Sequence, residues 1–150
     1  MDLVHEFTFH ATLAEPLMIG NGPYGTRVVY PVVDGQAKGD RISGTLVGGG
    51  GDWLLIGPDG WGRLDVRGQL QTDDGALVYM TYRGVLELND KVIAATQSTE
   101  AETGFDDQYF RTTPHFEVGD ERYAWMNHTV FVGRGRLIAG GVEYEVYRVT

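Results

Sequence analysis

The stretch from Gly48 to Gly75 constrains the fold of this chain more than any other part of the sequence. It begins with four consecutive glycines and ends with Asp-Asp-Gly, and between them a run from Arg63 to Thr72 alternates apolar and polar side chains. A period of two is typical of a β-strand, and an Asp-Gly step between two such runs is a strong hairpin signal. A second run follows from Ala76 to Leu88. The stretch therefore predicts two long strands joined by a tight turn.

The remainder of the chain repeats this pattern of short aromatic or β-branched runs separated by turn residues. Glycine accounts for 22 of the 150 residues, yet phenylalanine, tyrosine and tryptophan are also plentiful, which is unlike a disordered glycine-rich chain. We expect further strands at residues 6–13, 26–33, 40–47, 53–56, 108–118, 123–133, 135–139 and 142–149. Residues 91–107 are the one candidate for a short helix or a long loop. The pattern predicts an all-β fold with one domain over residues 1–150, a closed antiparallel barrel of eight to ten strands.

Charge and composition limit the classes of partner and the compartment. The net charge is −9, which disfavours nucleic acid and anionic membranes, because both reward clustered bases. Cysteine is absent, so disulfides and thiolate metal sites are excluded. The first residues carry acid where a secretory leader carries base, and we expect a cytoplasmic protein. All bases except Lys38 and Lys91 are arginines, which fits internal ion pairs or an anionic ligand and fits codon bias equally well.

The strand at 64–70 carries ionisable side chains within it. Asp65, Arg67 and Gln69 share one face, and Leu64, Val66, Gly68 and Leu70 share the other. If the polar face lines the barrel, Asp65 can move a proton and Arg67 can hold a carboxylate or enolate. The alternative is a solvated surface pair that contributes little.

Other residues are candidates for a ligand pocket, which needs apolar walls and a few placed polar groups. On the predicted strand 123–131, aromatic and hydrogen-bonding side chains share one face. Arg111 lies at strand spacing from Tyr109, and it can face the pocket or pair with Glu117 or Asp107 on the surface. The candidate substrate-binding residues are Trp53, Tyr82, Tyr109, Arg111, Tyr123, Trp125 and Asn127.

The glycine run at 48–51 does not match a phosphate-binding loop. It lacks the Gly-Lys-Ser/Thr ending, and no helical pattern follows it. We interpret it as a flexible turn or rim over the barrel mouth. Asp52 at its end is then either a third candidate catalytic acid or a turn-forming aspartate.

Metal and covalent chemistry have weak support in the sequence. The four histidines, His5, His10, His115 and His128, show no metal-ligand spacing, and neither Ser43 nor Ser98 sits in a nucleophile elbow. We expect no metal site and no cofactor.

Several motifs together resemble a known family. They are Gly-Gly-Gly-Asp-Trp at 49–53, Leu-Asp-Val-Arg at 64–67, Thr-Asp-Asp-Gly-Ala at 72–76, Tyr-Arg-Gly at 82–84, Tyr-Phe-Arg-Thr at 109–112, Tyr-Ala-Trp at 123–125, Asn127 and Val-Phe-Val-Gly at 130–133. The family is catalogued as domain of unknown function 3237, or uncharacterised protein family 0311. The resemblance spans nearly the whole chain and implies a barrel similar to lipocalins, but it implies no particular chemistry.

Three functional hypotheses follow from these observations. The first is a cofactor-free isomerase, lyase, hydratase or cyclase that acts on an apolar or aromatic ring compound by carboxylate and tyrosine acid–base chemistry. The second is a non-catalytic carrier of a hydrophobic small molecule. The third is a structural barrel that forms a homo-oligomer, a dimer in the simplest case, with Asp65 and Arg67 at the subunit contact.

Overall fold

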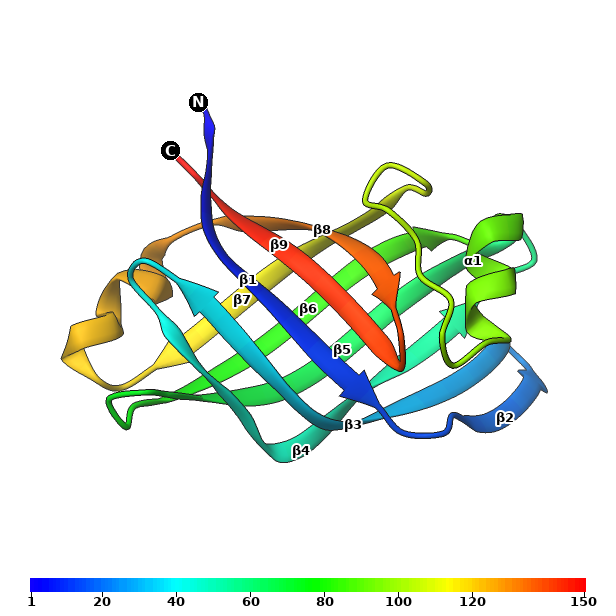
Figure 1. Cartoon of the computed structure of the whole chain (residues 1–150), viewed down its shortest axis with the longest axis horizontal. Helices are drawn as coiled ribbons and strands as arrows, with labels where there is room; N and C mark the ends of the chain where they lie inside the picture. Colours follow the sequence, from blue (N-terminus) through cyan, green and yellow to red (C-terminus); the bar gives the residue numbers. More distant parts are fainter.

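The computed structural model describes residues 1–150 and forms a closed antiparallel β-barrel of eight strands with one additional strand (Figure 1). The barrel closes because β1 pairs with both β9 and β3, while β2 pairs only with β3 and lies outside the ring. The elements are β1 Leu3–Leu13, β2 Leu17–Gly22, β3 Gly25–Gly39, β4 Ser43–Ile56, β5 Trp61–Thr72, β6 Leu77–Glu87, α1 Asp90–Thr96, β7 Phe110–Val118, the 3₁₀ helix η1 Glu121–His128, β8 Phe131–Ile138 and β9 Gly141–Val149. The all-β barrel predicted from the sequence is confirmed.

The β5–β6 hairpin forms as the sequence predicts. The two strands pair without a break from Trp61↔Glu87 to Gln71↔Leu77. Gly75 has a φ of 94°, a left-handed conformation that glycine adopts without strain, and the turn is closed by the Gly75 N–H donating to the Thr72 carbonyl. Burial alternates along both strands, so each strand has one face toward the barrel interior.

The interior is filled mainly by aromatic and aliphatic side chains. Rings from four different strands meet there: Phe9 stacks on Tyr144 with centroids 4.9 Å apart, and Phe116 meets Phe131 edge-on at 5.0 Å. Offset and edge-to-face contacts of this kind are favourable beyond the apolar area that they bury. An eight-stranded barrel has an interior just wide enough for side chains to fill, and this barrel follows that rule.

Three sequence expectations about strand limits are wrong. The glycine run does not separate two strands, because β4 continues through it as a bulged strand. Likewise β3 continues through Pro31 and Gly35. The predicted long strand 123–133 is replaced by η1 and a strand that begins only at Phe131.

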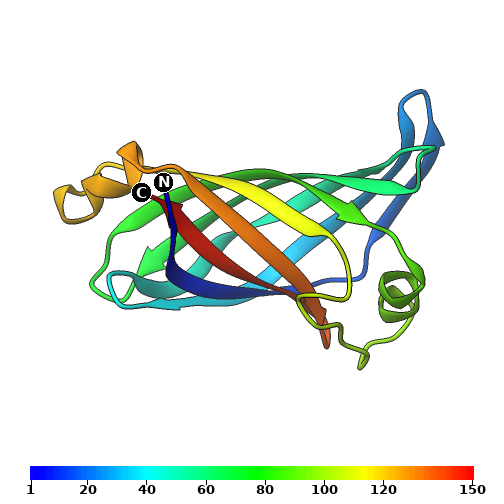
Figure 2. The ribbon, with the colours of Figure 1, turned by 90° about the horizontal axis from the view of Figure 1, so that it is seen from above.

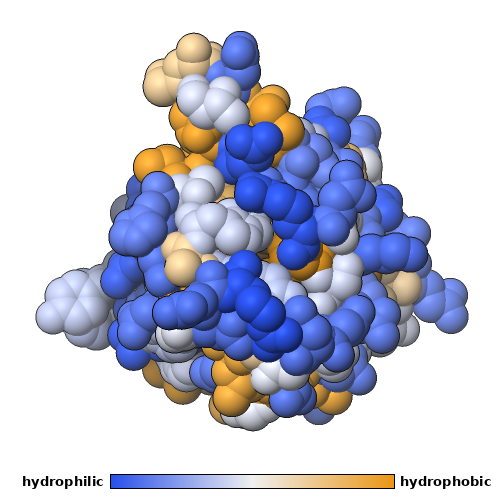
Figure 3. Space-filling view, turned by 90° about the vertical axis from the view of Figure 1, so that its left-hand side faces the viewer, coloured by the Kyte–Doolittle hydropathy of each residue, from blue (hydrophilic) through white to orange (hydrophobic).

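The two ends of the barrel are covered differently. At one end η1 crosses between β7 and β8, and at the other end α1 lies beside the strand ends, as the views from the front and from above agree (Figures 1 and 2). The Asn89 side chain caps α1 by accepting a hydrogen bond from the Val92 N–H, and Val92 is fully buried. The η1 end presents a largely hydrophilic surface (Figure 3). Neither helix has the length and apolar character needed to cross a membrane.

Candidate active site

A carboxylate on β4 faces the interior of the barrel. Asp52 pairs with Tyr30 on β3 and with Val66 on β5. Val66 is buried, and so is Leu54, two residues after Asp52 on the same strand. Because side chains directly opposite each other share a face of the sheet, Asp52 lies on the inner face with these residues.

Asp52 accepts one hydrogen bond, from the backbone N–H of Asp65 at 3.0 Å. β4 and β5 pair on either side of Trp53 and Leu54 but not at these two residues, so the carboxylate takes the place of a backbone acceptor. The Arg27 guanidinium in turn donates to the Trp53 carbonyl at 2.8 Å. The sheet is thus held at this point by two side chains instead of a continuous ladder.

Burial makes Asp52 a weak acid. Loss of hydration raises the pKa of Asp52 to about 7, the negative charge of Asp65 adds to this rise, and the hydrogen bond from Asp65 and the positive charge of Arg27 oppose it. A buried carboxyl without a close cation favours its neutral form. Near neutral pH the Asp52 carboxyl therefore exists in both protonation states.

Three tyrosines lie near this carboxylate in the interior. Tyr82 on β6 and Tyr144 on β9 are buried, with ring centroids 5.3 Å apart, and Tyr30 on β3 is partly buried. Burial raises the pKa of all three phenols, and the charge of Asp52 raises each of them further. They remain neutral hydrogen-bond donors across the physiological range. An ionisable carboxyl among neutral donors can transfer a proton and stabilise the anion that forms.

The prediction that Asp65 and Arg67 line the interior is wrong. Both lie on the outer face of β5, whose inner face carries the buried Leu64 and Val66. The nearest basic group to Asp65 is Arg83, at 3.7 Å, and that side chain is 77% exposed. The apolar face of this strand turned inward because the narrow interior gains most from burying it.

The other candidates on β4 and at the start of β7 also point outward. Trp53 is 42% exposed and Tyr109 is 50% exposed. Arg111 lies over the Tyr109 ring at 4.9 Å and donates to the Phe110 carbonyl; it pairs with neither Glu117 nor Asp107. Of the predicted substrate-binding residues, Tyr82 is the one that lies beside Asp52.

Tyr123, Trp125 and Asn127 belong to η1 and build the cap at one end of the barrel. The Tyr123 hydroxyl donates to Asp74 at 2.8 Å, and the Asn127 side chain bonds both the N–H and the carbonyl of Val118. The buried residues of η1, Tyr123 and Met126, are spaced by three, which matches the turn of a 3₁₀ helix. The apparent period of two in this segment was therefore misleading.

The sequence interpretation missed Tyr30 and Tyr144 as site residues. Tyr144 lies between Val142 and Val146 in an alternating run, which marks an inward position, but no local signal connects this strand with β4. The residues meet only because β9, β6 and β3 all contribute to one barrel.

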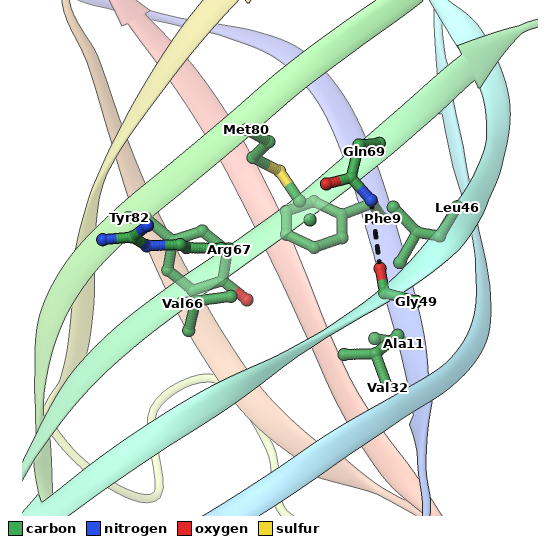
Figure 4. Close-up of a pocket in the computed structure, with 11 residues that line it drawn as sticks. Phe9, Ala11, Val32, Leu46, Gly49, Val66, Arg67, Gln69, Met80 and Tyr82 are labelled. Carbon is green, nitrogen blue, oxygen red and sulfur yellow. Dashed lines mark hydrogen bonds between the residues drawn. The ribbon is translucent and has the colours of Figure 1, made fainter.

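The enclosed space at the site is small. A cavity of about 10 Å³ lies beside Tyr82 (Figure 4), which is room for about one water molecule. It is lined mainly by apolar side chains: Phe9, Ala11, Val32, Leu46, Val66 and Met80, with Gly49, Gly68, Arg67 and Gln69 toward the outside. No group of three or more histidine, aspartate or glutamate side chains is arranged to hold a metal ion.

Comparison with known proteins gives a consistent picture of similarity. The model of a family described as "Protein of unknown function (DUF3237)" matches residues 1–149. A UPF0311 protein from Clostridium acetobutylicum is 30% identical, covering 100% of this chain and 95% of that protein. The crystal structure of a conserved protein of unknown function from Rhodopseudomonas palustris superposes with a TM-score of 0.89 at 30% identity, covering 99% of this chain and 97% of the other. An enzyme from Penicillium herquei shares the fold, with a TM-score of 0.70 at 19% identity over 97% of this chain and 93% of that one.

Proposed function

The chain belongs to the DUF3237 family, and from that premise we propose that it is a cofactor-independent enzyme that moves a proton on a small ring compound, with Asp52 as the acid–base group. The observation that carries this proposal is the position of Asp52: a carboxylate with a single hydrogen bond, inside an apolar barrel, among three tyrosines. The buried Glu6 carboxylate, by contrast, is paired with both Arg41 and Arg148.

The reaction class follows from the chemistry of these groups. An Asp52 carboxylate takes a proton from a ring carbon next to a carbonyl, the C–H electron pair forms a carbon–carbon double bond, and the carbonyl oxygen becomes an enolate. A neutral tyrosine donates a hydrogen bond to that oxygen. Where the ring carries a double bond between the β and γ carbons, the anion is a dienolate, and return of the proton to the γ carbon moves the double bond into conjugation and completes an isomerisation. An acid with a pKa about 7 suits both steps near neutral pH.

The distant barrel from Penicillium herquei is described as an enzyme, and we infer from it only that this fold can host catalysis. A fold by itself does not define a reaction. The alternative is a carrier of a hydrophobic small molecule, which the apolar lining of the interior cavity favours.

Proton exchange into a probe ketone tests the proposal. Wild-type protein, Asp52→Asn and Asp65→Asn are incubated in D₂O with 2-tetralone, 1-indanone and cyclohexanone, and deuterium incorporation next to the carbonyl is followed by NMR. We expect wild type to accelerate exchange of at least one ketone and Asp52→Asn to lose about 100-fold or more, the usual contribution of a general base. Asp65→Asn keeps the N–H that bonds Asp52 and removes only an outer-face charge that contributes to the raised pKa of Asp52, so it should lose far less activity than Asp52→Asn.

Two results would contradict the enzyme proposal. One is equal exchange by wild type and Asp52→Asn, which removes Asp52 from the chemistry. The other is no exchange above buffer with a ligand-induced rise in melting temperature by the same ketones, which supports the carrier instead.

A further inference from the structure

The barrel wall is interrupted at one level on both sides of β4. Between β3 and β4, pairing stops at Pro31↔Gly51 and resumes at Gln36↔Thr45. Between β4 and β5, the register shifts between Val47 and Gly50. Both interruptions surround the same segment of β4, so Gly48 and Gly49 pair with neither neighbour, and Gly50 pairs with Gly68 of β5 alone. We call Gly48–Gly50 the glycine strap.

The strap has a backbone that favours movement. Its three glycines have φ values of 71°, 76° and 138°, which side-chain-bearing residues rarely adopt. All three residues are exposed, and a Cβ at Gly49 would meet no atom within 4 Å. At Gly50, by contrast, a Cβ would meet the Arg67 carbonyl of β5, so the part of the strap with few contacts to lose is Gly48–Gly49.

The interior cavity lies directly beneath the strap. Gly49 lines it on the outside, and Phe9, Met80 and Tyr82 line it toward the centre of the barrel (Figure 4). Tyr82 is also one of the phenols whose pKa the Asp52 charge raises. Displacing the strap would thus open the cavity beside Tyr82 to the outside surface.

One side chain holds the strap in place. The Gln69 amide on β5 donates to the carbonyls of Val47 at 3.1 Å and Gly49 at 3.3 Å (the latter bond is drawn in Figure 4). These are the side-chain hydrogen bonds that tie the strap to β5. Gln71, two residues later on the same outer face, is exposed and makes no such bond, which provides a matched control.

We propose that displacement of the glycine strap enlarges the water-sized cavity into a binding site for a small aromatic or alicyclic ring, that this ring enters through the side wall, and that Gln69 keeps the site closed. The ligand class follows from the lining, in which apolar side chains predominate and Arg67 at the rim is the one charged residue. That the ring is also the substrate of Asp52 rests on the proposed function.

Met80 reports on opening of this site. It lines the cavity and is 4% exposed, whereas Met126 on the buried side of η1 is 1% exposed and Met18 on β2 is 67% exposed. Hydrogen peroxide oxidises a methionine only when it can reach the sulfur. Peptide mass spectrometry of the three methionines therefore compares the strap, the capped end and the open surface within one sample.

We expect Met80 in wild type to oxidise at a rate between those of Met18 and Met126. Gln69→Ala should raise the Met80 rate about fivefold or more, because it removes both hydrogen bonds that hold the strap closed, while Gln71→Ala leaves it unchanged. Saturating toluene should slow Met80 oxidation in wild type and in Gln69→Ala, and it should leave Met18 oxidation unaffected.

Four outcomes overturn the inference. The first is Met80 oxidation equal to that of Met126 in all variants, and the second is an equal response to Gln69→Ala and Gln71→Ala. The third is a parallel rise of Met126 oxidation, which indicates global opening. The fourth is that toluene does not slow Met80 oxidation, which shows that no ring binds there. Because oxidation does not depend on turnover, a failure here is distinct from failure of the ketone-exchange experiment, which reports on Asp52.

Discussion

The capped end of the barrel and the surroundings of Asp52 use buried polar groups in opposite ways. At the capped end, the Glu6 carboxylate is 4% exposed and receives Arg41 at 2.6 Å and Arg148 at 3.0 Å. Arg41 in turn lies over the Trp125 ring at 3.7 Å. Asp52 receives one backbone N–H and no side-chain cation within ion-pairing distance. Full pairing holds the end closed, whereas incomplete pairing leaves Asp52 able to exchange a proton.

The same contrast appears in acidity. Hydrogen bonds from Thr72 and Tyr123 lower the pKa of Asp74 at the capped end, whereas burial raises the pKa of Asp52 to about 7. One carboxylate is stabilised as an anion and the other is destabilised as an anion. A group kept in an unfavourable state is more often functional than structural, and four variants test that distinction.

The largest effect is expected from Asp52→Asn. An unfolded aspartate has a pKa near 3.8 and the folded one about 7, so the folded state holds the extra proton and wild type loses stability as pH rises from about 4 to about 7. At 1.36 kcal/mol per pKa unit, the asparagine variant should be more stable than wild type by on the order of 4 kcal/mol at pH 8. Urea unfolding at pH 8, 6 and 4.5 measures the gap, which should close toward the lowest pH. A variant less stable than wild type at pH 8 would contradict this account.

Glu6→Gln should have the next largest effect, in the opposite direction. It leaves Arg41 and Arg148 without their shared anion, and removing one partner of a buried pair costs about 3 kcal/mol or more. We expect about 3 kcal/mol, because both guanidinium groups are partly exposed. Urea unfolding at pH 7 provides the measurement, and Glu117→Gln on the exposed face of β7 provides the control. Equal stability of the two variants would show that the ion pairs of Glu6 with Arg41 and Arg148 do not stabilise the capped end of the barrel.

Asn127→Ala should destabilise the capped end by a smaller amount. It removes both hydrogen bonds to Val118, which is buried, and unsatisfied backbone groups cost about 2 kcal/mol. Urea unfolding measures the free energy lost in Asn127→Ala. The same measurement on His128→Ala, at the exposed neighbouring residue, gives the background from which the loss of the Val118 hydrogen bonds is separated. Ketone exchange should be unchanged, since Asn127 lies far from Asp52 in the fold. If Asn127→Ala instead lost ketone exchange while keeping its stability, the sequence-based prediction that Asn127 binds substrate would be supported.

Tyr123→Phe should have the smallest effect. It removes one hydrogen bond to Asp74, whose side chain is 47% exposed and also contacts Arg122, so we expect about 1 kcal/mol or less. The Asp74 pKa should rise, because the Tyr123 hydroxyl is one of the groups that lower it. NMR titration of the Asp74 carboxyl detects this change. An unaltered midpoint would contradict the prediction and indicate that Thr72 and Arg122 alone keep the pKa of Asp74 low.

The sequence shows which residues of a strand share a face, but it does not show which of the two faces points into the barrel. The alternation along 64–70 correctly divided Asp65 and Arg67 from Leu64 and Val66, and the error lay in assigning the polar face to the interior. Asp52 was readable in principle as an inward residue, because it lies two positions before the apolar Leu54. Because the sequence analysis interpreted the glycine run as a turn, it did not treat Asp52 as part of a strand, and the alternation from Asp52 to Leu54 was not used.

The amino-acid sequence alone determined that this chain forms strands, where its central hairpin turns, and which residues share a face. These properties depend on neighbours within a few positions along the chain. Only the tertiary structure decided which carboxylate is desolvated without a cation paired to it. The environment of Asp52 comes from Tyr30, Tyr82 and Tyr144 on three other strands, and desolvation depends on how distant segments close around a group.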